Sequence, residues 1–118
     1  METRYVTVPA NIEIEVMNPM TGKLVTATRD FESFIKERTN DSGVVGKTLD
    51  ALLLGLSIRQ SFAGCKPGTV IGLVFAEWEM LCTAIRTPTS GYNPEVMFQL
   101  LPMVRAVLDA PSTNPSQN

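Results

Sequence analysis

The spacing of hydrophobic positions changes near residue 30, and the segment before it has the two-residue period of β-strands. Residues 12–16 (Ile-Glu-Ile-Glu-Val) alternate apolar and polar side chains, which is typical of a strand with one buried face. Residues 18–22 have the composition of a turn, and a β-rich run at 24–28 follows. We therefore expect an N-terminal β-hairpin whose isoleucines face the core and whose glutamates face solvent. Residues 5–8 add a further short strand.

After residue 30 the apolar positions recur with the period of helices. Residues 31–38 place two phenylalanines and an isoleucine at i, i+3 and i+4, and Asp30 precedes them as a good N-cap. The same spacing predicts longer helices at about 48–62, 77–86 and 93–109. The helical part of the chain therefore comprises about four helices.

Three segments interrupt this pattern. Residues 69–75 are apolar enough for a short buried strand or for the first turns of a helix, and we favour an extended segment that enters a helix near Ala76. Pro102 lies inside the last predicted helix and should kink it, because proline lacks the N–H and clashes with the preceding turn. The polar residues 111–118 are rich in Pro, Ser and Asn and are predicted to be disordered.

The helix at 48–62 is apolar around most of its circumference, so its leucines predict a broad buried face. The predicted core consists of Leu49, Leu52, Leu56, Trp78, Leu81, Leu100 and Val104. The expected fold is α+β in a single domain over residues 1–110, with a hairpin of two or three short strands packed on the helices. A disordered polar tail at 111–118 completes it.

The charge composition excludes some classes of partner. The 118 residues contain 10 Lys+Arg and 12 Asp+Glu, a net charge of −2, and the basic residues are scattered. Nucleic-acid and membrane-surface binders carry basic clusters, so we expect no nucleic acid and no membrane as partner. There is no apolar run of about 20 residues and no leader, so we expect a cytoplasmic protein.

The chain carries little catalytic equipment. It has no histidine, and its two cysteines, Cys65 and Cys82, are too far apart in sequence to form a metal-spaced pair. Glu13 and Glu15 share one strand face, but solvated carboxylates are the commoner interpretation of that pattern. We therefore predict a non-enzymatic protein with no catalytic residues, no metal and no cofactor.

One segment looks like the phosphate-binding loop of nucleotide hydrolases. Residues 41–48 end in Gly-Lys-Thr, so Lys47 and Thr48 occupy the positions that would contact phosphate and magnesium. Asp41 stands where the first glycine belongs, and the preceding segment is predicted to be a helix rather than a buried strand. We interpret the segment as a connection between helices, with Thr48 as an N-cap.

The apolar helix faces exceed what one small domain can bury, and charged residues are few at 19%. Such a surplus favours contact with another protein, so we expect self-association or a protein partner. The last helix has a second apolar stripe, Met20 lies in the hairpin turn, and an aromatic residue precedes the last helix. The candidate interaction residues are Met20, Tyr92, Met97, Leu101 and Leu108.

The order of these elements resembles that of the tail assembly chaperones of tailed bacteriophages. The shared layout is the hairpin at 12–28, the helices at 30–109 and the polar tail at 111–118. The resemblance implies transient binding to a structural protein, oligomerisation, and a place in the host cytoplasm or the virion. The alternative is a small cytoplasmic regulatory or ligand-binding domain with an apolar pocket among Leu53, Trp78 and Leu100.

Overall fold

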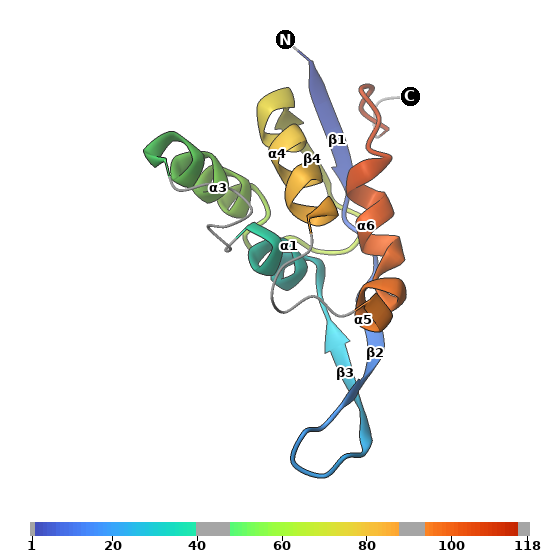
Figure 1. The fold of residues 1–118 in the computed structure, drawn as a ribbon. Coiled ribbons are helices and arrows are strands. Elements are labelled where there is room, and N and C mark those ends of the chain that lie inside the picture. Colours follow the sequence, from blue (N-terminus) through green and yellow to red (C-terminus); the bar gives the residue numbers. More distant parts are fainter. Residues whose placement is uncertain (1, 40–47, 88–93, 116–118) are drawn as a thin grey trace.

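A computed structural model describes residues 2–39, 48–87 and 94–115 and has the expected α+β architecture (Figure 1). The strands are β1 (Thr3–Thr7), β2 (Ile12–Met17), β3 (Leu24–Arg29) and β4 (Val70–Val74). The helices are α1 (Phe31–Thr39), α3 (Leu49–Ser61), α4 (Phe75–Arg86), α5 (Pro94–Gln99) and α6 (Leu101–Leu108). The strands form two separate antiparallel pairs, β1 with β4 and β2 with β3.

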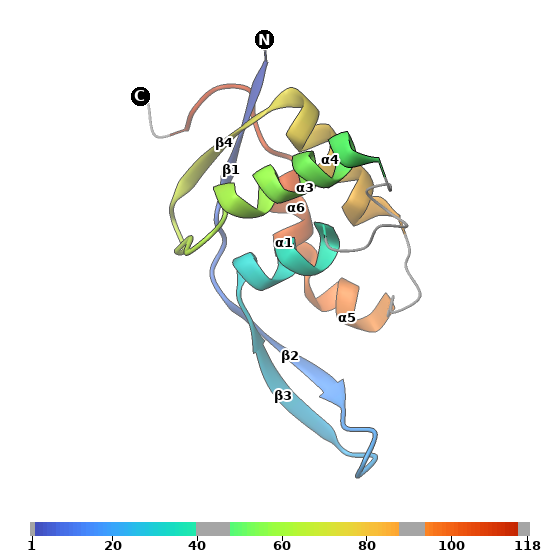
Figure 2. The same cartoon turned by 90° about the vertical axis from the view of Figure 1, so that its left-hand side faces the viewer.

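The predicted hairpin is confirmed, and it projects from the helices as an arm. We call β2, β3 and the turn between them the hairpin arm; Figures 1 and 2 show it leaving the rest of the molecule. Its register runs from Ile12 opposite Arg29 to Met17 opposite Leu24, and Gly22 supplies the positive φ of 69° in the turn. Ile14 is buried, whereas the two glutamates of β2 are exposed, as the alternation predicts.

The short N-terminal strand does not join the hairpin. It pairs instead with β4, from Thr3 opposite Val74 to Thr7 opposite Val70. Residues 70–74 are therefore a strand, and α4 begins at Phe75, close to the favoured entry at Ala76. The sharp change from strand to helix is stabilised by Glu77, whose carboxylate accepts a hydrogen bond from the Val74 N–H at 3.2 Å.

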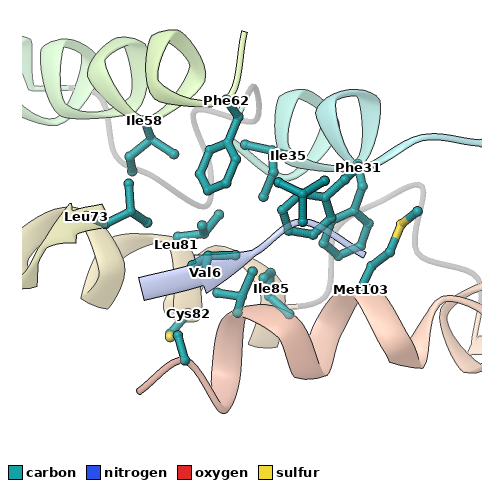
Figure 3. Packing of buried hydrophobic residues seen from close by; sticks show 14 of the residues in the cluster. Val6, Phe31, Ile35, Ile58, Phe62, Leu73, Leu81, Cys82, Ile85 and Met103 are labelled. Carbon is teal, nitrogen blue, oxygen red and sulfur yellow. The ribbon is translucent and has the colours of Figure 1, made fainter. Parts of the chain in front are cut away.

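The core lies between β1 and the helices α1, α3, α4 and α6. Figure 3 shows side chains from each of these elements converging around Val6 of β1. Phe31 contacts Phe62 edge-on, with ring centroids 5.5 Å apart. The largest fully buried hydrophobic side chains are Phe31, Phe62, Ile14, Ile35, Ile58, Leu73, Leu81, Met103, Val6 and Val107.

The predicted burial of the α3 leucines is wrong. Leu49, Leu52 and Leu56 are 70%, 47% and 44% exposed, whereas Ile58 on the opposite side of the helix is fully buried. Because α3 is apolar around most of its circumference, hydrophobic spacing alone does not determine which face is buried. Two side-chain hydrogen bonds hold the Ile58 side of α3 against the neighbouring helices, and this side is therefore the buried one. The Ser57 hydroxyl donates to the Glu77 carboxylate at 2.5 Å, and the Arg59 guanidinium donates to the Thr39 carbonyl at 2.9 Å.

The other four predicted core residues are buried or partly buried. Leu81 and Leu100 are buried, and Trp78 and Val104 pack partly buried against the cluster. The predicted caps are also found: Thr48 Oγ1 accepts a hydrogen bond from the Ala51 N–H, and Asp30 accepts one from the Ser33 N–H. Thr48 therefore caps α3, as the interpretation of 41–48 requires, while residues 41–47 lie outside the described part.

The last predicted helix is divided rather than kinked. α5 ends at Gln99 and α6 begins at Leu101, so the break precedes Pro102. Proline is favoured in the first turn of a helix, where its missing N–H has no intrahelical partner. The chain therefore starts a new helix at the position where the old one would clash with the ring. Beyond α6, residues 111–115 contain no helix or strand, in keeping with a polar tail.

Candidate interaction site

An apolar groove with a volume of about 420 Å³ lies where the end of α4 meets α5 and α6. Its lining consists of Ile85, Arg86, Pro94, Met97, Phe98, Leu101, Val104 and Leu108. Seven of these eight side chains are apolar. The groove is open to solvent, because Phe98 is 75% exposed and Leu101 is 36% exposed.

The groove exists because α6 is apolar on two faces. Met103 and Val107 point into the core and are fully buried. Leu101, Val104 and Leu108 follow one another at i, i+3 and i+7 on a different face and line the groove. The break at Leu100 separates α6 from α5, whose apolar side chains also line the groove.

The α5 wall is equally regular. Pro94, Met97 and Phe98 are spaced i, i+3 and i+4, so they share one face of this short helix. No residue of α5 is buried by the rest of the described chain. An element with an apolar face and no buried residue is the kind of surface that a partner covers.

One charged side chain takes part in the groove lining. Arg86, in the last turn of α4, is exposed and lies next to the buried Ile85. A guanidinium beside an apolar surface favours a ligand that carries a carboxylate close to apolar groups. The groove therefore offers both apolar anchoring and one directional polar contact.

The structure brings together three of the five predicted interaction residues. Met97, Leu101 and Leu108 all line the groove. Met20 is 90% exposed in the turn of the hairpin arm and is not part of the groove lining. Tyr92 lies outside the described residues.

Sequence reasoning missed the rest of the lining. Phe98 was not singled out, although it follows Pro94 by four residues and precedes Leu101 by three. That spacing could have placed it on the same stripe. Val104 was assigned to the core, and it contacts both the core cluster and the groove.

A second apolar surface lies on α3. We define the leucine stripe as Leu49, Leu52, Leu53 and Leu56, which are 70%, 47%, 54% and 44% exposed. Their spacing of i, i+3, i+4 and i+7 places them on one face over two turns. The predicted apolar pocket among Leu53, Trp78 and Leu100 is not formed, because Leu53 points to solvent while Leu100 is buried.

One glutamate and two cysteines are titratable side chains that lie buried or partly buried in the fold. Glu77 is 8% exposed and is held by Ser57 and by the Val74 N–H, so it fixes the start of α4 against α3. Burial raises the pKa of the Cys65 and Cys82 thiols above their usual value, which disfavours the reactive thiolates. Among the described residues no three Cys, Asp or Glu side chains gather where they could hold a metal ion.

No helix within the described ranges is long and apolar enough to cross a membrane. A scan against protein-family models found no match, and searches of curated proteins and of solved structures found none either.

Proposed function

We propose that this protein is a non-enzymatic interaction module that binds an apolar segment of another protein in the groove between α4, α5 and α6. The observation that carries the proposal is the groove itself, in which two consecutive short helices present apolar side chains to solvent. Phe98 is the main anchor, because large aromatic side chains contribute most to interface energies. Burying it on binding should contribute about 1.5–3 kcal/mol.

The segment that fits this groove best is an amphipathic helix with an acidic residue. Grooves between helices accept partner helices through apolar side chains at i, i+3 or i+4, and i+7. Met97, Phe98 and Leu101 supply matching apolar contacts along the groove. A carboxylate next to those anchors would pair with Arg86, the charged group in the lining.

The experiment is a selection of helical peptides displayed on phage against the full chain. We expect the selected peptides to carry the apolar spacing above with an adjacent Asp or Glu. Their affinity should fall at least about tenfold with Phe98→Ala, which corresponds to the loss of one aromatic anchor. Arg86→Ala should weaken only peptides that carry the acid.

Leu24→Ala, an exposed apolar residue of the hairpin arm, is the matched control and should leave the affinity unchanged. Selected peptides that bind equally well to the Phe98→Ala and wild-type chains would overturn the proposal. So would peptides that lose affinity with Leu24→Ala and not with Phe98→Ala.

The alternative function, a ligand-binding domain, is favoured by one observation. The groove volume of about 420 Å³ lies within the range of small-molecule sites, roughly 300–1,000 Å³. An apolar carboxylic acid such as decanoate would combine the apolar walls with Arg86. Saturable binding of decanoate by calorimetry, together with failure of the peptide selection, would favour this alternative.

An assembly role, as in the bacteriophage tail chaperones whose layout the chain resembles, is the finer form of the proposal. Tail assembly chaperones act by holding a structural protein transiently, which a shallow groove with few anchors supports. This role and a cytoplasmic or virion location remain predictions.

A further inference from the structure

The leucine stripe is a contiguous apolar surface that is exposed to solvent. Its four members lie on the face of α3 opposite Ile58, and no polar side chain separates them along the stripe. A contiguous apolar face on a helix is normally covered by packing. Within the described residues, α3 packs against α1, α4 and β4, and the stripe still lies open.

We propose that a second copy of this chain covers the leucine stripe, with the two α3 helices packed antiparallel about a two-fold axis. This inference does not depend on the groove, which lies on other helices. In the antiparallel arrangement Leu49 of each copy meets Leu56 of the other, and Leu52 meets Leu53. The stripe is therefore complementary to itself, which is the condition for a closed dimer.

The helix dipoles favour the antiparallel orientation. Antiparallel packing places the negative C-terminal end of one α3 beside the positive N-terminal end of the other, whereas a parallel pair would set like ends together. Asp50, in the first turn of α3, marks the N-terminal end of each copy.

The size of the stripe indicates a weak dimer. A stable interface buries about 800 Å² on each partner. The exposed parts of the four leucines equal about two whole leucine residues, and α3 has 13 residues, a length of about 20 Å. One helix face of this size falls below that standard, so we expect a weak dimer with a dissociation constant on the order of 100 µM.

The test is the native mass of the full chain by light scattering, measured from about 1 µM to about 500 µM, a range that brackets the expected constant. The wild-type chain should pass from monomer to dimer within this range. Leu53→Glu and Leu53→Lys should each remain monomeric, because each places like charges near the two-fold axis. An equimolar mixture of the two variants should form the dimer again, because opposite charges then meet.

Leu101→Glu is the control that separates this inference from the proposed function. It should abolish peptide binding in the groove and leave the dimer intact. A wild-type chain that stays monomeric throughout the range would overturn the inference. A dimer that Leu53→Glu leaves intact and Leu101→Glu dissociates would overturn it too, and would assign self-association to the groove.

Disulfide cross-linking tests the antiparallel orientation of the two α3 helices separately. In a background of Cys65→Ala, mixed Leu49→Cys and Leu56→Cys chains should form a disulfide-linked pair on mild oxidation, because the two positions face each other. Leu49→Cys chains alone should not link. Efficient linking of Leu49→Cys with itself would show a parallel pair and overturn the antiparallel arrangement.

Discussion

Leu52 and Ile58 lie six residues apart on α3, are of similar size and have opposite surroundings. Ile58 is fully buried among core side chains, whereas Leu52 is 47% exposed. Ile58→Ala should therefore cost about 2–5 kcal/mol of unfolding free energy, the usual range for a large side chain removed from a core. Leu52→Ala should cost less than about 1 kcal/mol, because the side chain removed is already half in water.

Chemical denaturation of the two variants, at a concentration low enough to keep the chain monomeric, measures both losses. Equal losses would contradict the facing of α3. A larger loss for Leu52→Ala would restore the facing that the leucine spacing alone predicts.

Asp30 makes the start of α1 sensitive to acid. The Ser33 hydroxyl donates a hydrogen bond to the Asp30 carboxylate at 2.7 Å, and this bond is the main cause that holds the pKa of Asp30 below its usual value. The folded state thus favours the ionised form, so its contribution to stability is complete above a pH of about 3.9. That contribution is lost as the pH falls through the lower, folded pKa.

Asp30→Ala should therefore cost about 0.5–2 kcal/mol near pH 7, as for other N-caps, and the cost should shrink in strong acid. Urea unfolding at several pH values provides the comparison. Glu37→Ala, an exposed position on the same helix, serves as the control. A cost that is constant down to the acid range would refute the assigned role of the carboxylate.

The hairpin arm is the element with the least support. Two-stranded hairpins are marginally stable in water by themselves. The outer edge of β2 is held by Gln99 of α5, whose side chain accepts from the Glu15 N–H at 2.8 Å and donates to the Glu15 carbonyl at 3.2 Å. One amide side chain thus takes the place of a neighbouring strand at this residue.

Gln99→Ala should loosen the arm and leave the core intact. We expect faster hydrogen exchange of the β2 and β3 amides and unchanged exchange in α4 and β1. Gln60→Ala, at an exposed position on α3, is the matched control. Unchanged exchange in β2 would show that the bonds to Glu15 do not support the arm.

Local signals in the sequence predict most of these elements and few of their partners. The alternation at 12–16 and the caps at Asp30 and Thr48 depend on neighbouring residues, so they are visible in the sequence. The pairing of β1 with β4 depends on residues far apart in the chain, and no local pattern encodes it. The facing of α3 was missed for a related reason, since it is set by single hydrogen bonds to α4 and α1.

The part of the candidate site that depends on local spacing could be predicted from the sequence, and the part that depends on tertiary neighbours could not. The second apolar stripe of the last helix was visible, and it placed Met97, Leu101 and Leu108 together. The contribution of Ile85 and Arg86 was not visible, because it requires the end of α4 to lie beside α6. That placement is a property of the tertiary fold.

At the scale of the whole molecule, Arg4 joins the first strand to the end of the last helix. Its guanidinium lies 4.5 Å from the Trp78 ring centroid and donates to the Ala110 carbonyl at 3.1 Å. The Trp78 indole N–H donates to the Val107 carbonyl at 2.8 Å. Together these contacts hold β1, α4 and the C-terminal end of α6 in one arrangement.

Arg4→Ala should therefore destabilise the protein by about 1.5–3 kcal/mol, the range for hydrogen bonds to charged groups. Trp78 is the single tryptophan of the chain, so its fluorescence reports both the folded surroundings and the unfolding transition. Arg105→Ala, whose side chain is exposed and 4.0 Å from Asp109, should be nearly neutral. Equal effects of the two variants would show that Arg4 does not connect the two ends.

The position of β1 also determines when the protein can fold during its synthesis. β1 is synthesised before its partners, because it pairs with β4 (Val70–Val74) and the Tyr5 N–H donates to the Pro111 carbonyl. At the usual rates of translation, β1 waits on the order of ten seconds for these partners. β1 therefore stays unpaired, with Val6 exposed, until β4 and residue 111 have been synthesised, so closure of the core around Val6 is coupled to the synthesis of segments far along the chain.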